Sequence, residues 1–174
     1  VDFSIRPDRQ RLLQLRQQLA DMGLHGFLIP RTDEHQGEFV APRAERLRWL
    51  TGFSGSAGLA IVLADTAAIF VDGRYTLQVR QQADETVFSP HHLIESPPDK
   101  WIAETLPKGG RLGYDPWLHS QSAAERFAKA AEKAGGELVP VEANPIDAVW
   151  GNQPAAPIAP IHTHDLVFAG KNAA

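Results

Sequence analysis

The sequence predicts an α/β fold in which helices and strands alternate. Short apolar runs of strand length alternate with amphipathic segments of helical spacing up to about residue 150. Two of these runs, residues 59–63 and 67–71, are joined only by Ala64-Asp65-Thr66, which indicates a β-hairpin. We therefore expect a sheet that contains an antiparallel pair of strands and has helices packed on it.

An amphipathic helix is expected over residues 8–22, before a short buried strand at residues 26–29. The apolar residues of the helix recur at helical spacing between arginines and glutamines, and they are Leu12, Leu15, Leu19 and Met22. Gly23 ends this helix, and Pro30 closes the strand. A helix that leads into a short strand is typical of an α/β layer.

The remaining elements are expected from the same signals, apolar periodicity and helix-breaking residues. In chain order they are helical turns at residues 44–50, the hairpin strands, a helix from 73 to about 83, a strand near 86–88, a helix from 97 to 106, a strand at 111–114, a helix at 120–134, a strand at 137–141 and a short helix ending at 150. The helix at 120–134 has the clearest ends, because Ser120 can cap its start and Gly135-Gly136 can stop it.

Length and composition limit the class of protein. The chain has 174 residues, 43% of them hydrophobic, which suffices for one domain and a tail but is short for two domains. A formal net charge of −4 argues against a nucleic-acid partner, and the four tryptophans are spread singly rather than forming a stacking platform. The absence of cysteine excludes disulfides and thiolate metal sites and suits a reducing cytoplasm. No apolar run approaches the roughly 18 residues of a membrane span, so we expect a soluble, cytoplasmic protein.

A domain boundary is expected in residues 152–160, where three prolines indicate a semi-rigid linker. We therefore assign residues 1–151 to one domain and residues 161–174 to the truncated start of a following domain. The chain begins at Val1 rather than at a methionine, and a new apolar patch occupies residues 165–169. We expect this sequence to be a fragment of a longer protein.

A turn rich in glycine and serine, residues 52–58, invites two enzyme interpretations. A nucleophile elbow would place Ser56 between a strand and a helix, but Ser54 occupies the first glycine position of that motif and a strand follows the turn. A phosphate-binding loop would need a lysine, which the turn lacks. The preferred interpretation is a tight turn with close backbone packing.

Two clusters contain residue types that bind metals in other proteins: Asp33, Glu34, His35 and Glu38 in the loop after the first strand, and His162, His164 and Asp165 in the tail. Closeness in one loop is weak support for a metal site, so we prefer a solvated or interface role for the first cluster and a mobile tail for the second. His91-His92, after Pro90, is expected to be an exposed loop pair.

The segment Asp72-Gly73-Arg74-Tyr75 follows the second hairpin strand. Asp72 can cap the next helix, and Arg74 would project from the first turn of that helix. Two roles for Arg74 stay open. Its planar guanidinium could clamp a carboxylate, or it could form a local ion pair with Asp72.

An ordered set of motifs resembles the N-terminal domain of Xaa-Pro aminopeptidase (aminopeptidase P). The set comprises residues 29–58, FVDGRYTLQ at 70–78, LGYDP at 112–116 and NPIDAVW at 144–150. Each motif alone is moderately specific, but their order and spacing together are strongly specific. The resemblance covers about residues 9–160 and implies a creatinase-type N-terminal domain, a mixed β-sheet flanked by helices in a ribonuclease-H-like arrangement. From Ile161 the tail resembles the entry to the second domain of the three-domain form.

The resemblance implies that the chemistry of the parent protein belongs to a C-terminal domain. In that family two aspartates, one histidine and two glutamates hold two divalent metal ions, commonly manganese, which activate a water molecule against the Xaa-Pro bond. None of that domain lies in these 174 residues. We therefore expect no catalytic residue, metal ligand or cofactor in this chain, and no activity from this fragment alone.

The resemblance also implies a domain that shapes the substrate cleft of a metallo-aminopeptidase and supports contacts in a homo-oligomer. The expected partners are the C-terminal catalytic domain of the same protein and peptides with proline at the second position, without nucleic acid or membrane. His35, Glu38 and Arg74 are expected to face the cleft, because their loops most closely resemble the family. Two other interpretations stay open: a peptide- or histone-binding module of a catalytically dead homologue, and a free-standing binding module.

Overall fold

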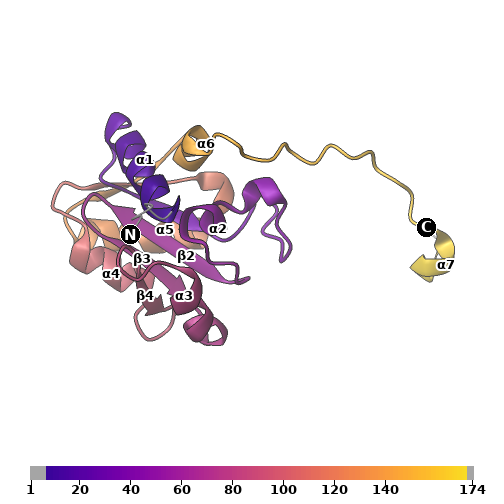
Figure 1. Ribbon diagram of the computed structural model, residues 1–174, viewed down its shortest axis with the longest axis horizontal. Helices are drawn as coiled ribbons and strands as arrows, with labels where there is room; N and C mark the ends of the chain where they lie inside the picture. The colour runs from indigo at the N-terminus through magenta and orange to yellow at the C-terminus, as the bar shows by residue number, and fades with distance from the viewer. Residues whose placement is uncertain (1–6, 172–174) are drawn as a thin grey trace, which may run out of the picture.

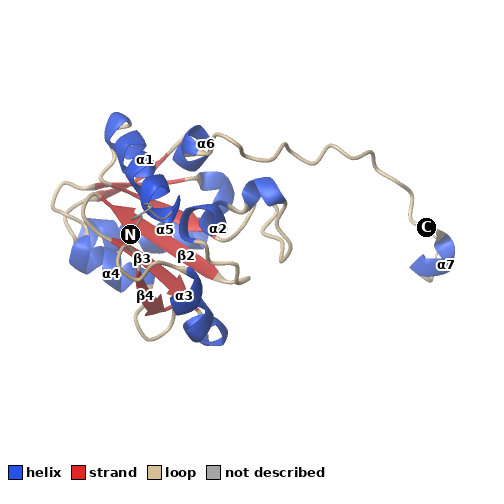
Figure 2. Ribbon diagram, viewed as in Figure 1, coloured by secondary structure: helices blue, strands red, loops and turns tan. Residues whose placement is uncertain are grey.

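The computed structural model describes residues 7–171, which form a six-stranded β-sheet, helices on both of its faces and an extended tail (Figures 1 and 2). The strands lie in the order β4-β3-β2-β1-β5-β6. Their bounds are β1 Gly26–Pro30, β2 Gly58–Leu63, β3 Ala67–Val71, β4 Ser89–His92, β5 Arg111–Tyr114 and β6 Glu137–Pro140. β2 is antiparallel to β1 and β3, whereas the β3–β4, β1–β5 and β5–β6 pairs are parallel. The sheet is therefore mixed, as the resemblance implied, and every strand except β2 ends at the same edge.

Helices connect and cover these strands. The α-helices of the described residues are α1 Pro7–Asp21, α2 Arg46–Thr51, α3 Thr76–Gln82, α4 Pro98–Thr105, α5 Gln121–Lys133, α6 Pro145–Val149 and α7 Leu166–Ala169. Short 3-10 helices are η1 Pro42–Ala44, η2 Gly73–Tyr75 and η3 Pro116–Leu118. As predicted, the Ser120 hydroxyl caps α5 by accepting the Ala123 N–H at 3.3 Å.

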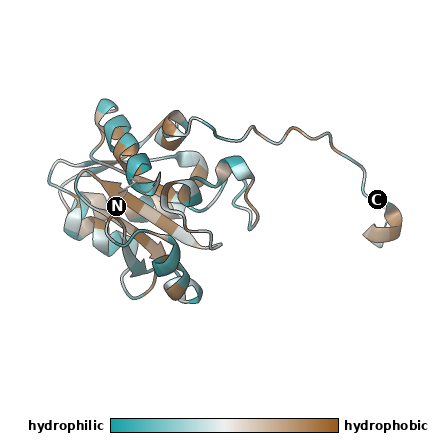
Figure 3. Ribbon diagram, in the orientation of Figure 1, coloured by the Kyte–Doolittle hydropathy of each residue, from teal (hydrophilic) through white to brown (hydrophobic). Residues whose placement is uncertain are grey.

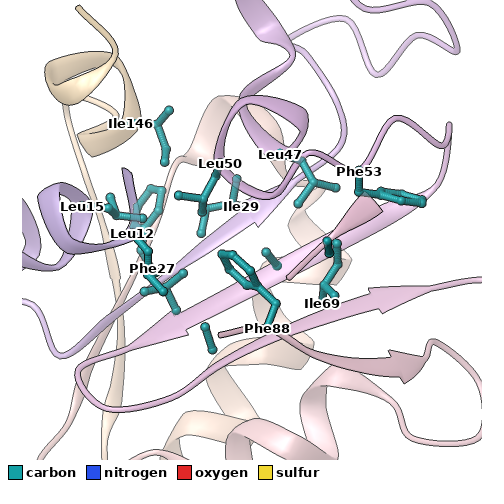
Figure 4. Close-up of a cluster of buried hydrophobic side chains, with 14 of the residues drawn as sticks. Leu12, Leu15, Phe27, Ile29, Leu47, Leu50, Phe53, Ile69, Phe88 and Ile146 are labelled. Atoms are coloured by element: carbon teal, nitrogen blue, oxygen red, sulfur yellow. The ribbon is translucent and has the colours of Figure 1, made fainter. Parts of the chain in front are cut away.

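Two apolar clusters enclose the sheet, one on each face. Residues of α1, α2 and α6 pack against a face that includes Phe27 and Ile29 (Figure 4). Residues of α4 and α5 pack against the opposite face, which includes Leu28. This alternation follows from strand geometry, since successive side chains point to opposite faces. Because both faces are covered, β1, β2 and β3 are buried along nearly their whole length and form continuous hydrophobic runs (Figure 3).

The predicted strand near residues 86–88 is wrong, because residues 85–87 form a turn and β4 begins only at Ser89. Asp84 organises the turn by accepting the Thr86 N–H at 3.0 Å and the Thr86 hydroxyl at 2.6 Å. The hydrogen bond from the Thr86 hydroxyl is the main cause that lowers the pKa of the Asp84 carboxyl to about 2. Phe88 directly follows this turn and its side chain is fully buried in the core. The hydrophobicity of Phe88 therefore reflects burial at the end of a turn rather than a strand.

The prediction that His91-His92 is a loop pair is also wrong. Both residues belong to β4, where His91 lies beside Phe70 and His92 beside Val71 of β3. The His91 ring stacks on the Phe70 ring with centroids 5.1 Å apart. β4 is an edge strand, and this position allows the sheet to accept Pro90, which has no N–H to donate.

The tail leaves the domain after α6 and runs away from it (Figure 1). Gln153 is still fastened to the domain, because its side-chain amide donates to Asp147 Oδ1 at 2.7 Å and to the Arg43 carbonyl at 3.0 Å. Residues 154–165 form no regular structure and are exposed. The assignment of a linker and a following domain stays a prediction. Among residues 7–171, no helix combines the length and hydrophobicity needed to span a membrane.

Candidate functional site

The polar loops predicted from the sequence gather along one edge of the sheet, which we call the carboxyl edge. It consists of residues 31–41 after β1, 72–75 after β3, 93–97 after β4 and 115–119 after β5, together with the glycine-rich turn 52–57 that precedes β2. These segments meet because β1, β3, β4 and β5 point the same way and β2 runs back. Ligand sites of α/β sheets usually lie beyond the carboxyl ends of the strands.

Asp33 shapes the loop after β1. Its side chain is buried, and Oδ1 accepts the backbone N–H groups of His35 at 3.0 Å and Gly37 at 3.3 Å. This pattern is the local turn that aspartate favours, and it directs the Asp33 carboxylate into the loop. The His35 side chain is 81% exposed, and its Nε2 lies 3.9 Å from a carboxylate oxygen of Glu34.

Arg31 fixes the far half of the same loop, a role that sequence reasoning missed. Its Nη1 donates to the backbone carbonyl of Glu38 at 2.6 Å, and its Nη2 lies 3.5 Å from a carboxylate oxygen of Glu45. Glu38 remains exposed. Hydrogen bonding to Asp72 is the main cause that raises the pKa of the Arg74 guanidinium, and the negative charge of Glu38 makes a smaller contribution in the same direction. The structure thus brings Glu38 and Arg74, two of the three predicted cleft residues, within electrostatic reach of each other.

His35 lines a cavity of about 490 Å³, which Trp117 and the start of the tail also line and which neither Glu38 nor Arg74 lines. Arg46 lines this cavity too, and its guanidinium makes a two-pronged ion pair with Asp147 at 2.7 and 2.8 Å. Asp115 accepts the side-chain amide of Asn144 at 2.9 Å. The buried charged groups around the cavity are therefore hydrogen-bonded within the domain, whereas His35 and Glu34 are exposed polar groups at the cavity wall.

Asp72 and Arg74 form an ion pair with several hydrogen bonds on the carboxyl edge. Asp72 Oδ1 caps η2 by accepting the Arg74 N–H at 2.9 Å, as predicted. The Arg74 guanidinium also donates to this carboxylate, from Nε at 3.1 and 3.2 Å and from Nη2 at 2.7 Å. The side-chain hydrogen bond from Arg74 is the main cause that lowers the pKa of Asp72. The predicted local ion pair is confirmed, yet the Arg74 side chain stays 67% exposed.

Ser56 belongs to the same group. Its hydroxyl lies 2.9 Å from the hydroxyl of Tyr75, and this hydrogen bond is the main cause that lowers the pKa of Tyr75. In the described part of the chain the partner of Ser56 is thus a phenol rather than an imidazole, and β2 follows the turn, so a nucleophile elbow is not formed. No group of three or more histidine, aspartate or glutamate side chains within residues 7–171 is arranged to hold a metal ion.

Comparison with known proteins agrees with this fold. Residues 11–149 match the family model of the creatinase/prolidase N-terminal domain. The chain belongs to this family. The creatinase/prolidase domain is 39% identical over 166 residues to a probable Xaa-Pro aminopeptidase P of Paracoccidioides brasiliensis, covering 94% of this chain and 27% of that protein. It is 36% identical over 160 residues to human Xaa-Pro aminopeptidase 2, covering 91% of this chain and 24% of that protein. The chain therefore spans about a quarter of the length of these curated relatives.

Solved structures give the same assignment. The domain superposes on an X-prolyl aminopeptidase from Caenorhabditis elegans, described as a cytosolic enzyme with a di-nuclear active site, with a TM-score of 0.77 and 28% identity, over 85% of this chain and 26% of that chain. It also superposes on the N-terminal domain of the cytoplasmic peptidase PepQ from Mycobacterium tuberculosis, with a TM-score of 0.60 and 26% identity, over 80% of this chain and 98% of that one. The chain is an N-terminal domain of the kind found in Xaa-Pro aminopeptidase-like proteins.

Proposed function

We propose that this chain is the non-catalytic N-terminal domain of a metal-dependent Xaa-Pro aminopeptidase, which removes the first residue from peptides with proline second. Its similarity to aminopeptidases over about a quarter of their length supports this proposal. We place two divalent metal ions, with manganese as the expected metal, in the C-terminal catalytic domain, and a structural relative described as having a di-nuclear active site supports this placement. When bound there, such ions supply an activated water molecule.

The part of the domain that we assign to the substrate cleft is the carboxyl edge, and the observation that carries the assignment is its exposed side chains. Glu38 and Arg74 present opposite charges there. Large apolar side chains that are at least three-quarters exposed lie in the segments after β1, β4 and β5, and another lies in the first turn of α3; they are Phe39, Ile94, Trp117 and Leu77. A surface that combines charged groups with several exposed apolar side chains is typical of one that another part of the protein covers.

The role of this edge would be to bind and orient rather than to react. An aminopeptidase substrate carries an ammonium group next to the scissile bond, and the Glu38 carboxylate would attract such a group. Arg74 would hold a carboxylate. His35 would line the same wall at the neighbouring cavity.

The location and assembly of the parent are also part of the proposal. We place it in the cytoplasm, because two structural relatives are described as cytosolic and cytoplasmic proteins. We assign it a homo-oligomeric state, in which the exposed apolar side chains of the carboxyl edge would contact either the catalytic domain or a neighbouring subunit.

Hydrolysis of Xaa-Pro peptides in the presence of manganese tests whether the catalytic activity lies outside this domain. The full-length protein that contains this sequence should release the first residue, and the 174-residue chain at the same concentration should not. Activity of the chain alone would overturn the proposal. An inert but folded full-length protein would also overturn it, and would favour a peptide- or histone-binding homologue instead.

A further inference from the structure

We propose that Asp72, Tyr75 and Ser56 are positioning residues, which hold the Arg74 guanidinium as a preformed carboxylate-binding group on the carboxyl edge. The inference rests on the proposed function, because it takes Arg74 to face the substrate cleft. It also gives a role to the glycine-rich turn, which matches neither a nucleophile elbow nor a phosphate loop.

Asp72 engages one side of the guanidinium and leaves the other side available. The carboxylate accepts from Nε and from Nη2, which is a side-on arrangement. Among the hydrogen bonds of residues 7–171, none involves Nη1 of Arg74. The end of the guanidinium formed by Nη1 and the second N–H of Nη2 can therefore donate two hydrogen bonds to a second carboxylate.

The Tyr75 ring supports the guanidinium through a cation–π contact. The guanidinium carbon of Arg74 lies 5.1 Å from the centroid of the Tyr75 ring, which is a cation–π distance. Two contacts hold the ring, because its hydroxyl pairs with Ser56 and the ring makes a T-shaped contact with Phe53, with centroids 5.5 Å apart. An arginine held in this way loses little side-chain entropy on binding, which favours affinity and orientation.

The glycine-rich turn makes room for the Tyr75 ring, because no side chain could fit at position 55. A β-carbon on Gly55 would lie 2.3 Å from Cζ of Phe53 and 2.9 Å from Cδ1 of Tyr75, so both rings occupy the space that any other residue would fill. The turn is also fastened to α3, because the Gln82 side-chain oxygen accepts the Ser54 N–H at 2.9 Å. Turn, ring and guanidinium therefore form one packed unit, which links the turn before β2 to η2 and to the end of α3.

The ligand chemistry that fits this unit is a single carboxylate. Its planar shape matches the free end of the guanidinium. The negative charges of Asp72 and Glu38, both of which act on Arg74, disfavour a group of higher charge such as a phosphate. The carboxylate would come from the C-terminus of a short peptide substrate or from an acidic side chain of the catalytic domain.

A double-mutant cycle in the full-length enzyme tests the proposal. Arg74→Ala should lower kcat/KM about 10- to 100-fold, the range expected for losing a hydrogen bond to a charged group. Asp72→Asn keeps an oxygen to cap η2 but removes the negative charge. It should lower kcat/KM about fivefold, mainly by raising KM, which is within the range of coupling between residues in contact. In the Arg74→Ala background, Asp72→Asn and Tyr75→Phe should cause no further loss, because they act through Arg74.

Each outcome bears on one claim. An equal loss from Asp72→Asn with and without Arg74 would overturn the positioning role. A full effect of Arg74→Ala with a neutral Asp72→Asn would overturn it too. Failure of the wild-type enzyme to cleave any Xaa-Pro peptide would instead refute the proposed function. Peptides with a free C-terminus and with a C-terminal amide distinguish the source of the carboxylate: the Arg74→Ala effect disappears on the amide if the substrate supplies it, and persists if the protein does.

Discussion

Replacing Gly55 with alanine is expected to destabilise the domain, because the new β-carbon would lie 2.3 Å from the Phe53 ring and 2.9 Å from the Tyr75 ring. The Phe53 side chain is fully buried, so its ring has little room to move away. Overpacking in a rigid core costs about 1–3 kcal/mol, and two ring contacts this short place the expected loss near 2–3 kcal/mol. For a domain of this size that loss corresponds to about 4–12 °C in Tm.

Urea unfolding of the 174-residue chain, followed by tryptophan fluorescence, measures this loss. Gly151→Ala is the matched control, because no atom lies within 4 Å of its added β-carbon and its backbone is not left-handed. The control should stay within about 0.5 kcal/mol of the wild-type protein. If Gly55→Ala unfolds at the same urea concentration as Gly151→Ala, then the turn tolerates a side chain and the close packing that we describe is wrong.

Three further predictions concern paired and titrating groups. Arg46→Ala leaves a half-buried carboxylate without its two-pronged partner and should cost about 2–4 kcal/mol in urea unfolding, whereas no change would show that the pair is solvated. The hydrogen bond from Thr86 holds the Asp84 pKa at about 2, below its ordinary value of 3.8, so this group stabilises the fold above pH 4 and the contribution is lost as the pH falls towards 2. Asp84→Asn should remove that part of the acid sensitivity, and an unchanged acid-unfolding curve would contradict the assignment. Ser56→Ala should raise the pKa of Tyr75. An ultraviolet titration can resolve this change because the chain has only two tyrosines, and an unchanged titration curve would contradict the hydrogen bond between Ser56 and Tyr75.

Local signals in the sequence predicted most of the fold. The leucine spacing of α1 and the cap and stop signals of α5 are contained within single segments, so they could be recognised without the tertiary structure. β4 could not be recognised in this way, because the buried Phe88 lies before the strand and Pro90 is tolerated only at the edge of the sheet. Edge position depends on the order of strands, which local periodicity does not encode.

The candidate site was predictable in part. Asp72 and Arg74 are two residues apart, and the capping preference of aspartate sufficed to predict their contact. Arg31 was missed because its partners are a backbone carbonyl and a glutamate fourteen residues away. The role of the glycine-rich turn was missed because its purpose, seating Tyr75, depends on a residue from beyond the hairpin. The aromatic Phe53 between the glycines was the signal that could have indicated close ring packing.

The cleft assignment depends most directly on Arg74, and its matched control is Arg80, an exposed arginine on α3 whose guanidinium pairs with Glu85 at 2.7 Å. Exposed pairs of this kind contribute little, so Arg80→Ala should leave kcat/KM for Xaa-Pro peptides unchanged in the full-length enzyme. Arg74→Ala should lower it about 10-fold or more. Equal kcat/KM values for the two variants, both matching the wild-type enzyme, would contradict the assignment of the carboxyl edge to the substrate cleft.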